Sequence, residues 1–557
     1  MQLEIASSQL QSFPFDHHGL IASVCKDLKI AERIDALLPV HEERVVSPGL
    51  AVVALILNGL GFTNRRLYLT PQFFASKPVE RLFDAPIRAQ DLNDYTLGHA
   101  LDDIASYGVS RLFGSVAFGI ALDNGLLGQL NHLDSTTLSV SGAYEKGASE
   151  DAEPGTIHLT YGHSKDKRPD LKQAVLSLVV NGPSNMPIWM DALDGNSSDK
   201  KEFHETIRKV RAFQKELAIK DNFKWVADSA LYSADRLLAA NDYLWLTRVP
   251  ESIAEARDWV NRPEGEIHWK AGEEGYKYAE TLSVHGNIPQ RWLLVYSEQG
   301  YAREKKTLEK NLEKQEVQIG KEIRNLGGVA FGCEHDAEVE LGKLRKEYPL
   351  YQIHGQVISV KKYAGKGKPA ADATPVRIDY KLDLIAERNE EAVMEVLNRK
   401  GRFILATNDM DADAYPAIQM LKEYKEQQNV EGGFRFLKDP WFMVDSVFLK
   451  SPQRVAALMV VMTLCLLVYN IAQYKLRSRL KKTGEALPNQ LNKPVQNPTL
   501  RWIFQIMEGL GMVRIQETPN GAPRELLTNL SDLRKKIIQL FGPTACRMHG
   551  LNPESAL

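Results

Sequence analysis

The chain has 557 residues, 44% hydrophobic and 25% charged, a composition typical of a soluble globular protein with three or four domains. Its net charge of −2 excludes a protein that binds nucleic acid through overall positive charge, so any DNA contact must come from local basic patches. The four cysteines form no C-x-x-C pair, which argues against a zinc site and fits a reducing cytosol. Since no signal peptide is visible at the start, we expect a cytoplasmic protein.

Residues 1–122 are predicted to form a mostly helical domain. Ser47 and Pro48 make a cap and first-turn pair before the apolar run 50–60, and a second helix with polar periodicity covers 91–106. Basic residues lie between the two helices. A small DNA-binding domain and a helical cap packed on the next domain both fit this pattern.

Residues 123–249 change to the alternating, β-branched pattern of strands. Asp134 lies in the first predicted strand, and Asp228 follows the fourth. Functional side chains gather at strand ends in mixed α/β sheets, which makes these two acids candidates for a site. The expected order is β-β-β-α-β-α-β, with strands at 129–140, 173–180, 186–190, 223–227 and 243–247 and a helix at 200–217.

Residues 250–398 interrupt this core with a β-rich insertion. A long, highly charged helix is predicted at 303–324, with Leu308, Leu312 and Ile319 on a loose apolar stripe. It is interpreted as part of a surface helical hairpin, either for partner or DNA contact or simply solvated. The loop 365–369 contains lysine and glycine, which suits a phosphate backbone but is also common in exposed turns. The predicted strands are 281–284, 291–296, 356–360 and 376–380, and a helix at 390–399 follows.

Residues 399–480 are predicted to complete the core, with a strand at 402–407 and a helix beginning near Asp413. A helix turns about 100° per residue, so a continuous helix would bring four polar side chains to one face. They are a phenol, an amide, a carboxylate and an ammonium, an unusual set for a stripe facing a core. A solvated surface is the other interpretation. The four residues are Tyr424, Gln427, Glu431 and Lys438.

The run 455–472 has 18 residues without a charge, just long enough for a membrane span. It contains Thr463 and Asn470 in a chain otherwise built as soluble, which favours a buried core helix. A basic run at 475–482 follows, suited to nucleic acid or to a solvated helix end. Residues 481–557 are expected to form a linker and a helical C-terminal region, with helices at 500–511 and 526–541.

Asp134, Asp228 and Glu431 together form a set of hard oxygen ligands of the kind that Mg²⁺ prefers. Two such ions about 3.5–4 Å apart would stabilise the attacking and leaving oxygens of a phosphoryl transfer. His132 and His163 are expected to form hydrogen bonds rather than to bind metal.

Five residues in three motifs carry a resemblance. They are Asp134 in His-Leu-Asp-Ser-Thr-Thr, Asp228 in Val-Ala-Asp-Ser-Ala-Leu, and the spacing of Tyr424, Glu431 and Lys438. With these motifs, the chain resembles bacterial insertion-sequence DDE transposases that carry a Tyr-x2-Arg-x3-Glu-x6-Lys signature. Segments 162–173 and 194–199 also resemble family sequence, and the likeness covers about residues 15–480.

The resemblance implies an α/β fold: an RNase H-like mixed sheet interrupted by the β-rich insertion, with helical regions at both ends. It implies a cut-and-paste transposase acting as a homodimer on terminal inverted repeats and target DNA, with a hairpin intermediate and two Mg²⁺ ions, for which Mn²⁺ can substitute. No membrane and no small-molecule substrate are expected. A flipped base would stack on Trp245, Trp269 or Trp292, a choice left open. The residues expected to bind DNA are Tyr424, Gln427, Lys438, Arg168, Lys172 and Arg435.

Two residues depart from the family pattern. Gln427 stands where the signature has Arg, and Ser229 follows Asp228 where Arg is frequent. Since an amide cannot replace the charge of a guanidinium on a phosphate, DNA positioning is expected to be weaker or to come from Lys425 or Arg435. Two alternatives therefore stay open: an RNase H-like nuclease without strand transfer, and a catalytically decayed DNA-binding derivative.

Overall fold

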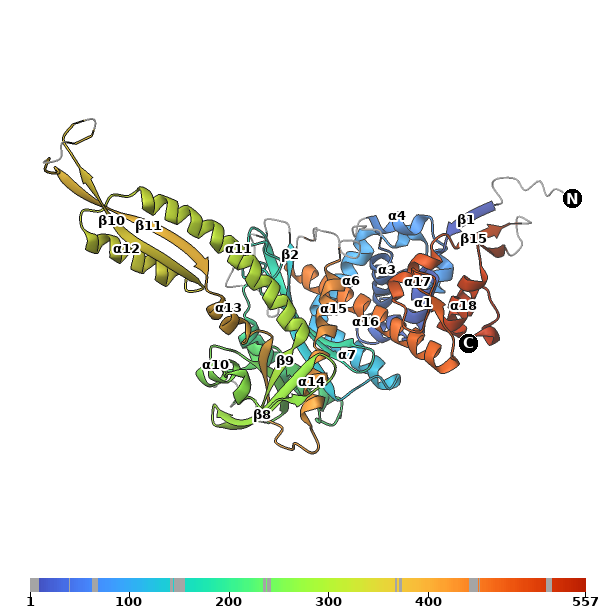
Figure 1. The fold of residues 1–557 in the computed structure, drawn as a ribbon. Helices are drawn as coiled ribbons and strands as arrows, with labels where there is room; N and C mark the ends of the chain where they lie inside the picture. The colour runs from blue at the N-terminus through green and yellow to red at the C-terminus, as the bar shows by residue number, and fades with distance from the viewer. Residues whose placement is uncertain are drawn as a thin grey trace. The chain divides into compact units, whose positions relative to one another are not determined.

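The computed structural model divides the chain into two compact units (Figure 1). The first contains Met1–Thr247 and Lys422–Leu557, and the second contains Arg248–Leu421. The structure describes residues 10–39, 41–62, 69–140, 144, 156–233, 237, 242–365, 368–369, 373–439, 449, 451–516 and 523–557.

The N-terminal part of the first unit is helical, as predicted. The Ser47 hydroxyl accepts a hydrogen bond of 3.2 Å from the Leu50 amide and so caps the third helix. The basic residues Arg65 and Arg66 lie outside the described residues. The helices are α1 (His18–Asp27), α2 (Ile30–Asp35), α3 (Pro48–Gly59), α4 (Thr70–Ala75), α5 (Val79–Phe83), α6 (Asp94–Tyr107) and α7 (Val109–Asp123).

The core strands of the first unit confirm the RNase H-like prediction. They are β2 (Leu130–Val140), β3 (Lys172–Asn181), β4 (Met186–Leu193), β5 (Lys224–Ala227) and β6 (Leu244–Val249). Their order is β4-β3-β2-β5-β6, in which β2, β3 and β4 are antiparallel while β5 runs parallel to β2 and β6. Helix α8 (Asp199–Glu216) connects β4 to β5. The second connecting helix, expected before β6, falls largely outside the described residues.

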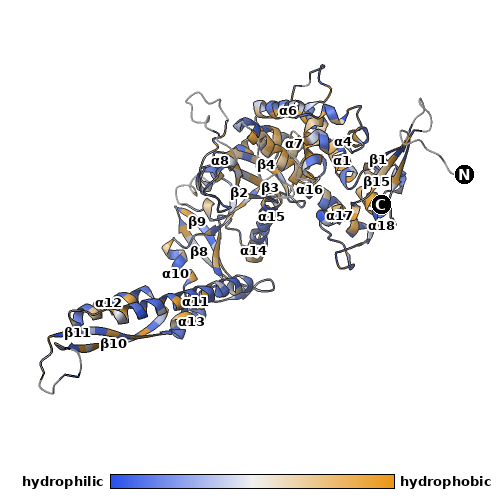
Figure 2. Ribbon diagram, turned by 90° about the horizontal axis from the view of Figure 1, so that it is seen from above, coloured by the Kyte–Doolittle hydropathy of each residue, from blue (hydrophilic) through white to orange (hydrophobic). Residues whose placement is uncertain are grey.

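The apolar run forms the buried helix α16 (Pro452–Thr483), which packs on α3, α6, α7 and β4. Figure 2 shows its hydrophobic colouring. Its polar residues are satisfied within the unit: Thr463 donates to the Met459 carbonyl at 2.7 Å, and Asn470 donates to the Asn185 carbonyl at 2.6 Å. By length and composition α16 is the one described helix that could itself cross a membrane, but 83% of its apolar window is buried in the structure.

The C-terminal region is less helical than predicted. The expected helices 500–511 and 526–541 are shorter, as α17 (Leu500–Met507) and α18 (Asp532–Phe541), and α19 (Pro543–Met548) follows. Between them, β15 (Gly511–Ile515) and β16 (Arg524–Thr528) join β1 (Leu10–Pro14) in an antiparallel sheet. The pairing partner of β15 comes from the other end of the chain, so local sequence patterns did not reveal this sheet.

The second unit contains two groups of elements. Strands β7 (Lys270–Ala271), β8 (Tyr276–His285), β9 (Ile288–Ser297) and β12 (Arg402–Thr407) pair antiparallel in the order β12-β9-β8-β7. Helix α10 (Ala254–Val260) packs on β12.

The second group is an arm of α11 (Glu298–Gly328), α12 (Glu334–Glu347), the hairpin β10 (Tyr351–Lys362) and β11 (Arg377–Arg388), and α13 (Glu390–Leu397). The long charged helix predicted at 303–324 lies within α11, a continuous helix of 31 residues, and α12 follows it as the second helix of the hairpin. Figure 2 shows the largely hydrophilic colouring of these helices. The apolar stripe of α11 includes the buried Leu312 and Ile319. Part of the loop 365–369 lies outside the described residues.

Candidate active site

Asp134 and Asp228 occupy neighbouring positions where β5 ends beside the middle of β2. Strands β2 and β5 are parallel, and the last pair in their register is Leu133 with Ala227. Asp134 is the next residue of β2, and Asp228 is the first residue after β5. The ladder of backbone hydrogen bonds therefore brings two partly exposed carboxylates to neighbouring positions on the two strands.

Backbone groups fix both carboxylates. The Asp134 Oδ1 atom accepts a hydrogen bond from the Ser135 amide at 2.7 Å, and the Asp228 Oδ1 atom accepts one from the Ala230 amide at 2.8 Å. Thr247 on β6 donates to the Asp228 carbonyl at 2.6 Å. These contacts hold the two acids on a rigid part of the sheet.

The predicted continuous helix from Asp413 through Glu431 is wrong. The structure has α14 (Ala417–Lys425) and α15 (Gln428–Leu437), separated by a turn at Glu426 and Gln427. The start is also later, because the Asp411 carboxylate closes a turn by accepting hydrogen bonds from the amides of Asp413 and Ala414. Tyr424 and Glu431 thus belong to different helices.

At the break, the Gln427 side chain is buried against β2. Its Nε2 atom donates to the Leu133 carbonyl at 3.0 Å, and its Oε1 atom lies 3.2 Å from the His132 Nδ1 atom. Burial lowers the pKa of His132 below its ordinary value, which favours the neutral imidazole. His132 is therefore a hydrogen-bonding residue, as expected. That Gln427 binds DNA stays a prediction.

Glu431 lies exposed in the first turn of α15, one helical turn after Gln427. The opposite side of α15 is buried on β2 and α16, with Val430 and Leu437 fully covered. Gly433 allows the close approach to α16, because a Cβ atom there would lie 3.1 Å from the Leu466 Cδ2 atom.

The cationic residues predicted to bind DNA are placed differently from one another. Lys438 pairs with Asp166 at 2.6 Å, and Lys172 donates to the Tyr144 carbonyl at 3.3 Å. Arg168 is exposed and pairs with Asp170 at 2.8 Å, while Arg435 is exposed on α15. Lys438 and Arg435 therefore lie at the end of α15, while Arg168 and Lys172 belong to the segment that leads into β3.

The sequence analysis missed Lys165. Its ammonium group donates to the Ser135 carbonyl at 2.7 Å and lies 3.9 Å from the Asp134 Oδ1 atom. Lys165 belongs to the segment 162–173, which was noted only as similar to family sequence. Its neighbour Asp166 bonds to Lys438, so this segment contacts both the strand that carries Asp134 and the end of α15.

The tryptophans expected to include a base-stacking residue differ in burial. Trp245 and Trp292 are fully covered core residues, each with less than 2% of its surface exposed. Trp269 is half-buried, and the Arg402 guanidinium lies 5.7 Å from its ring centre.

The carboxylates of Asp134 and Asp228 are chemically suited to bind a divalent ion, because Mg²⁺ takes oxygen ligands and keeps several waters. Among the residues that the structure describes, no group of three His, Cys, Asp or Glu side chains is gathered closely enough to hold an ion. Asp134 and Asp228 occupy neighbouring positions on β2 and after β5, and that they bind metal together with Glu431 stays a prediction.

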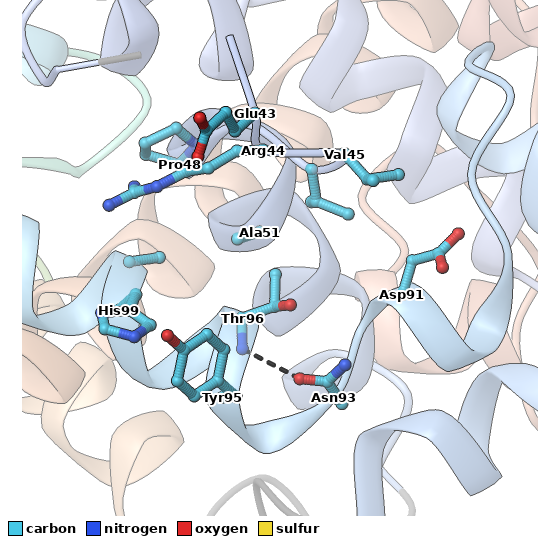
Figure 3. A pocket seen from close by; sticks show the side chains of 12 residues that line it. Glu43, Arg44, Val45, Pro48, Ala51, Asp91, Asn93, Tyr95, Thr96 and His99 are labelled. Carbon is cyan, nitrogen blue, oxygen red and sulfur yellow. Dashed lines mark hydrogen bonds between the residues drawn. The ribbon is translucent and has the colours of Figure 1, made fainter. Parts of the chain in front are cut away.

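A separate pocket of about 280 Å³ lies between the start of α3 and α6 (Figure 3). It is lined on one side by Arg44 and Pro48 and on the other by Tyr95 and His99, whose rings meet edge to face at 4.2 Å. None of the predicted site residues lines it.

Comparison with known proteins identifies the family. The model of a family described as "Transposase DDE domain" matches residues 129–470, more than half of the chain. The chain belongs to the DDE transposase family. This transposase is therefore of a class of enzymes that cleave DNA, and its family generally uses divalent metal ions.

The other comparisons add little to this assignment. A family described as a domain of unknown function (DUF4277) matches residues 10–118 of the transposase, and no curated protein matches the chain. A similar solved structure is titled "Cryo-EM structure of piggyBac transposase synaptic complex with hairpin DNA (SNHP)". It is 11% identical with a TM-score of 0.35, covering 89% of this chain and 82% of that chain, and carries no further argument.

Proposed function

We propose that this protein is the transposase of an insertion sequence, which binds the terminal inverted repeats of its element and moves it by metal-dependent strand cleavage and strand transfer. The proposal includes a cut-and-paste route with a hairpin intermediate and a homodimer in the DNA complex. It rests on the family and on the chemistry of the edge that carries Asp134 and Asp228.

The observation that carries the proposal is the register of β2 and β5. By this register, Asp134 on β2 and Asp228 after β5 occupy neighbouring positions, and α15, which carries Glu431, packs on the same strand β2. Three carboxylates from two adjacent strands and a neighbouring helix are the ligands that a two-ion phosphoryl transfer uses.

We assign the roles as follows. Asp134, Asp228 and Glu431 would hold two Mg²⁺ or Mn²⁺ ions, which supply an activated water or 3′-hydroxyl and stabilise the leaving oxygen. Lys165, beside Asp134, binds the phosphate next to the cleaved bond through its ammonium group. Lys438 and Tyr424 bind neighbouring phosphates, and for Lys438 a phosphate replaces the Asp166 carboxylate.

The test measures Mg²⁺-dependent cleavage of a plasmid that carries the DNA flanking the gene. The wild type is compared with Asp134→Asn, Asp228→Asn and Glu431→Gln, each beside a binding assay with the element ends. We expect each substitution to abolish cleavage at the ends while end binding persists. Glu313→Gln, an exposed carboxylate of α11, is the matched control and should cleave normally.

Other outcomes select the alternatives. Cleavage without joining of the freed ends to target DNA would indicate a nuclease, and end binding without cleavage by the wild type would indicate a decayed derivative. Cleavage that survives Glu431→Gln would remove α15 from the active site.

A further inference from the structure

The break between α14 and α15 is held by one buried side chain. Gln427 is 8% exposed, and both polar atoms of its amide are bonded to β2. In the family signature this position is an arginine, which would bind a DNA phosphate. In this chain the position is a buried glutamine that is hydrogen-bonded to β2.

The orientation of the amide follows from its partners. A backbone carbonyl only accepts hydrogen bonds, so the Gln427 Nε2 atom must face Leu133. The Oε1 atom then faces His132, whose Nδ1 atom must carry the hydrogen that it donates. The other ring nitrogen of His132 lies 3.9 Å from the Glu426 carboxylate. The Leu133 carbonyl and the His132 ring therefore fix one orientation of the Gln427 amide.

This contact joins the helix to the residues that place the two aspartates. Leu133 precedes Asp134 and is paired in register with Ala227, which precedes Asp228. Gln427 ends the turn from which α15 starts, and Glu431 follows one turn later. A short path of one buried amide and one helical turn thus connects Glu431 to the aspartate pair.

The remaining anchors of α15 do not replace this one. Gly433 packs on Leu466 of α16, and Lys438 pairs with Asp166 at the far end of the helix. Gln427 is the contact on the β2 side, before Glu431. Without Gln427, helix α15 would keep its apolar packing on β2 and α16, but its start would lose the hydrogen bonds to His132 and to the Leu133 carbonyl.

We propose that Gln427, held by His132 and the Leu133 carbonyl, is a positioning residue that sets Glu431 against Asp134 and Asp228 for metal binding. The inference deepens the proposed function and rests on it. It makes Gln427 a structural support of the carboxylate set in this chain rather than a DNA contact.

The test maps metal-bound residues with Fe²⁺, ascorbate and hydrogen peroxide, which produce hydroxyl radicals that cut the backbone close to the bound ion. The whole protein is used, and fragment ends are read by mass spectrometry. We expect wild-type cuts near 134, 228 and 431. In Gln427→Met, which keeps the length but removes both polar atoms, the cut near 431 should fall about tenfold relative to the other two.

Two variants control this result. Gln428→Met is the same change at the next residue, whose side chain is exposed, and should give the wild-type map. His132→Phe removes the other half of the contact while keeping a buried ring, and its cut near 431 should fall in the same way. It replaces Gln427→Met as the test variant if Gln427→Met does not fold. Thermal unfolding shows which variants are folded.

End binding without Mg²⁺ separates positioning from DNA contact. Positioning predicts wild-type end binding by Gln427→Met together with a 10- to 100-fold slower cleavage, a range of about that size being usual for residues that orient metal ligands. Weaker end binding with an unchanged iron map would overturn the inference and make Gln427 a DNA contact. A wild-type map without a cut near 431 would also overturn it. Neither result depends on cleavage by the wild type, which tests the proposed function.

Discussion

The two halves of the proposed carboxylate site are placed by different means. Asp134 and Asp228 are set by the backbone ladder of two parallel strands, whereas Glu431 is set by side chains that hold α15 to β2 and α16. A ladder repeats at every residue and tolerates many side chains. A side-chain contact depends on a few atoms and can be removed without unfolding the sheet. The aspartates should therefore be robust to substitution around them, and Glu431 should be sensitive.

The largest effect should come from breaking the ladder. Ala227→Pro removes a donor in β5, which lies between β2 and β6, and we expect a loss of about 3 kcal/mol or more in the free energy of unfolding. Ala227→Gly keeps the donor and should cost about 1 kcal/mol. Urea unfolding followed by circular dichroism measures both, and equal effects would contradict a ladder-held pair.

The contact between Gln427 and His132 comes next. Each of Gln427→Met and His132→Phe leaves a buried partner without its hydrogen bond and should cost about 1–3 kcal/mol. In the double variant both partners are gone, so the loss should be smaller than the sum by about 1 kcal/mol. Additive losses in such a cycle would show that the two side chains act independently.

The glycines of α15 offer a smaller and more local comparison. A Cβ atom at Gly432 meets nothing within 4 Å, so Gly432→Ala should stabilise the protein by about 0.5–1 kcal/mol through helix propensity. At Gly433 the same atom would press on the buried Leu466, and Gly433→Ala should gain less or destabilise. Thermal unfolding of the two variants tests this. Equal gains in stability would mean that the Leu466 side chain of α16 moves aside without a loss of free energy.

The smallest effect should come from the pair of Lys438 and Asp166. Both side chains are partly exposed, so Lys438→Gln or Asp166→Asn should change the stability by less than about 1 kcal/mol. Their effect on DNA should be opposite in sign: Lys438→Gln removes a cation and should weaken end binding, whereas Asp166→Asn frees Lys438 and should strengthen it. Fluorescence anisotropy with an end oligonucleotide measures this. Equal weakening by both would remove Lys438 as a phosphate contact.

Sequence patterns predicted the parts that depend on local periodicity. The alternation around Asp134 and before Asp228 predicted both strands, and the uncharged run predicted the buried α16. The helix through Gln427 was predicted as continuous because a count of 100° per residue assumes no interruption. At the interruption, Gln427 contacts His132, 295 residues earlier in the chain, and no local pattern shows such a contact.

Contacts between distant parts of the chain also explain why sequence patterns did not predict β15 or the role of Lys165. Strand β15 pairs with β1 from the opposite end of the chain, and Lys165 reaches Asp134 from a loop that was recognised only as family sequence. The charged composition of 303–324 predicted the long helix α11, whereas the bounds of its hairpin partner α12 were not predicted.

The sheet of β1, β15 and β16 has a consequence for synthesis. Strand β1 is made first, yet its partner β15 is made only after some five hundred further residues, and the carbonyl of Leu510 accepts hydrogen bonds from the amides of Phe15 and Asp16. A ribosome that stops early releases N-terminal helices whose edge strand has no partner, which exposes it to aggregation and proteolysis. Frameshifted or prematurely terminated copies of the gene should therefore yield little stable N-terminal fragment to compete with the intact protein.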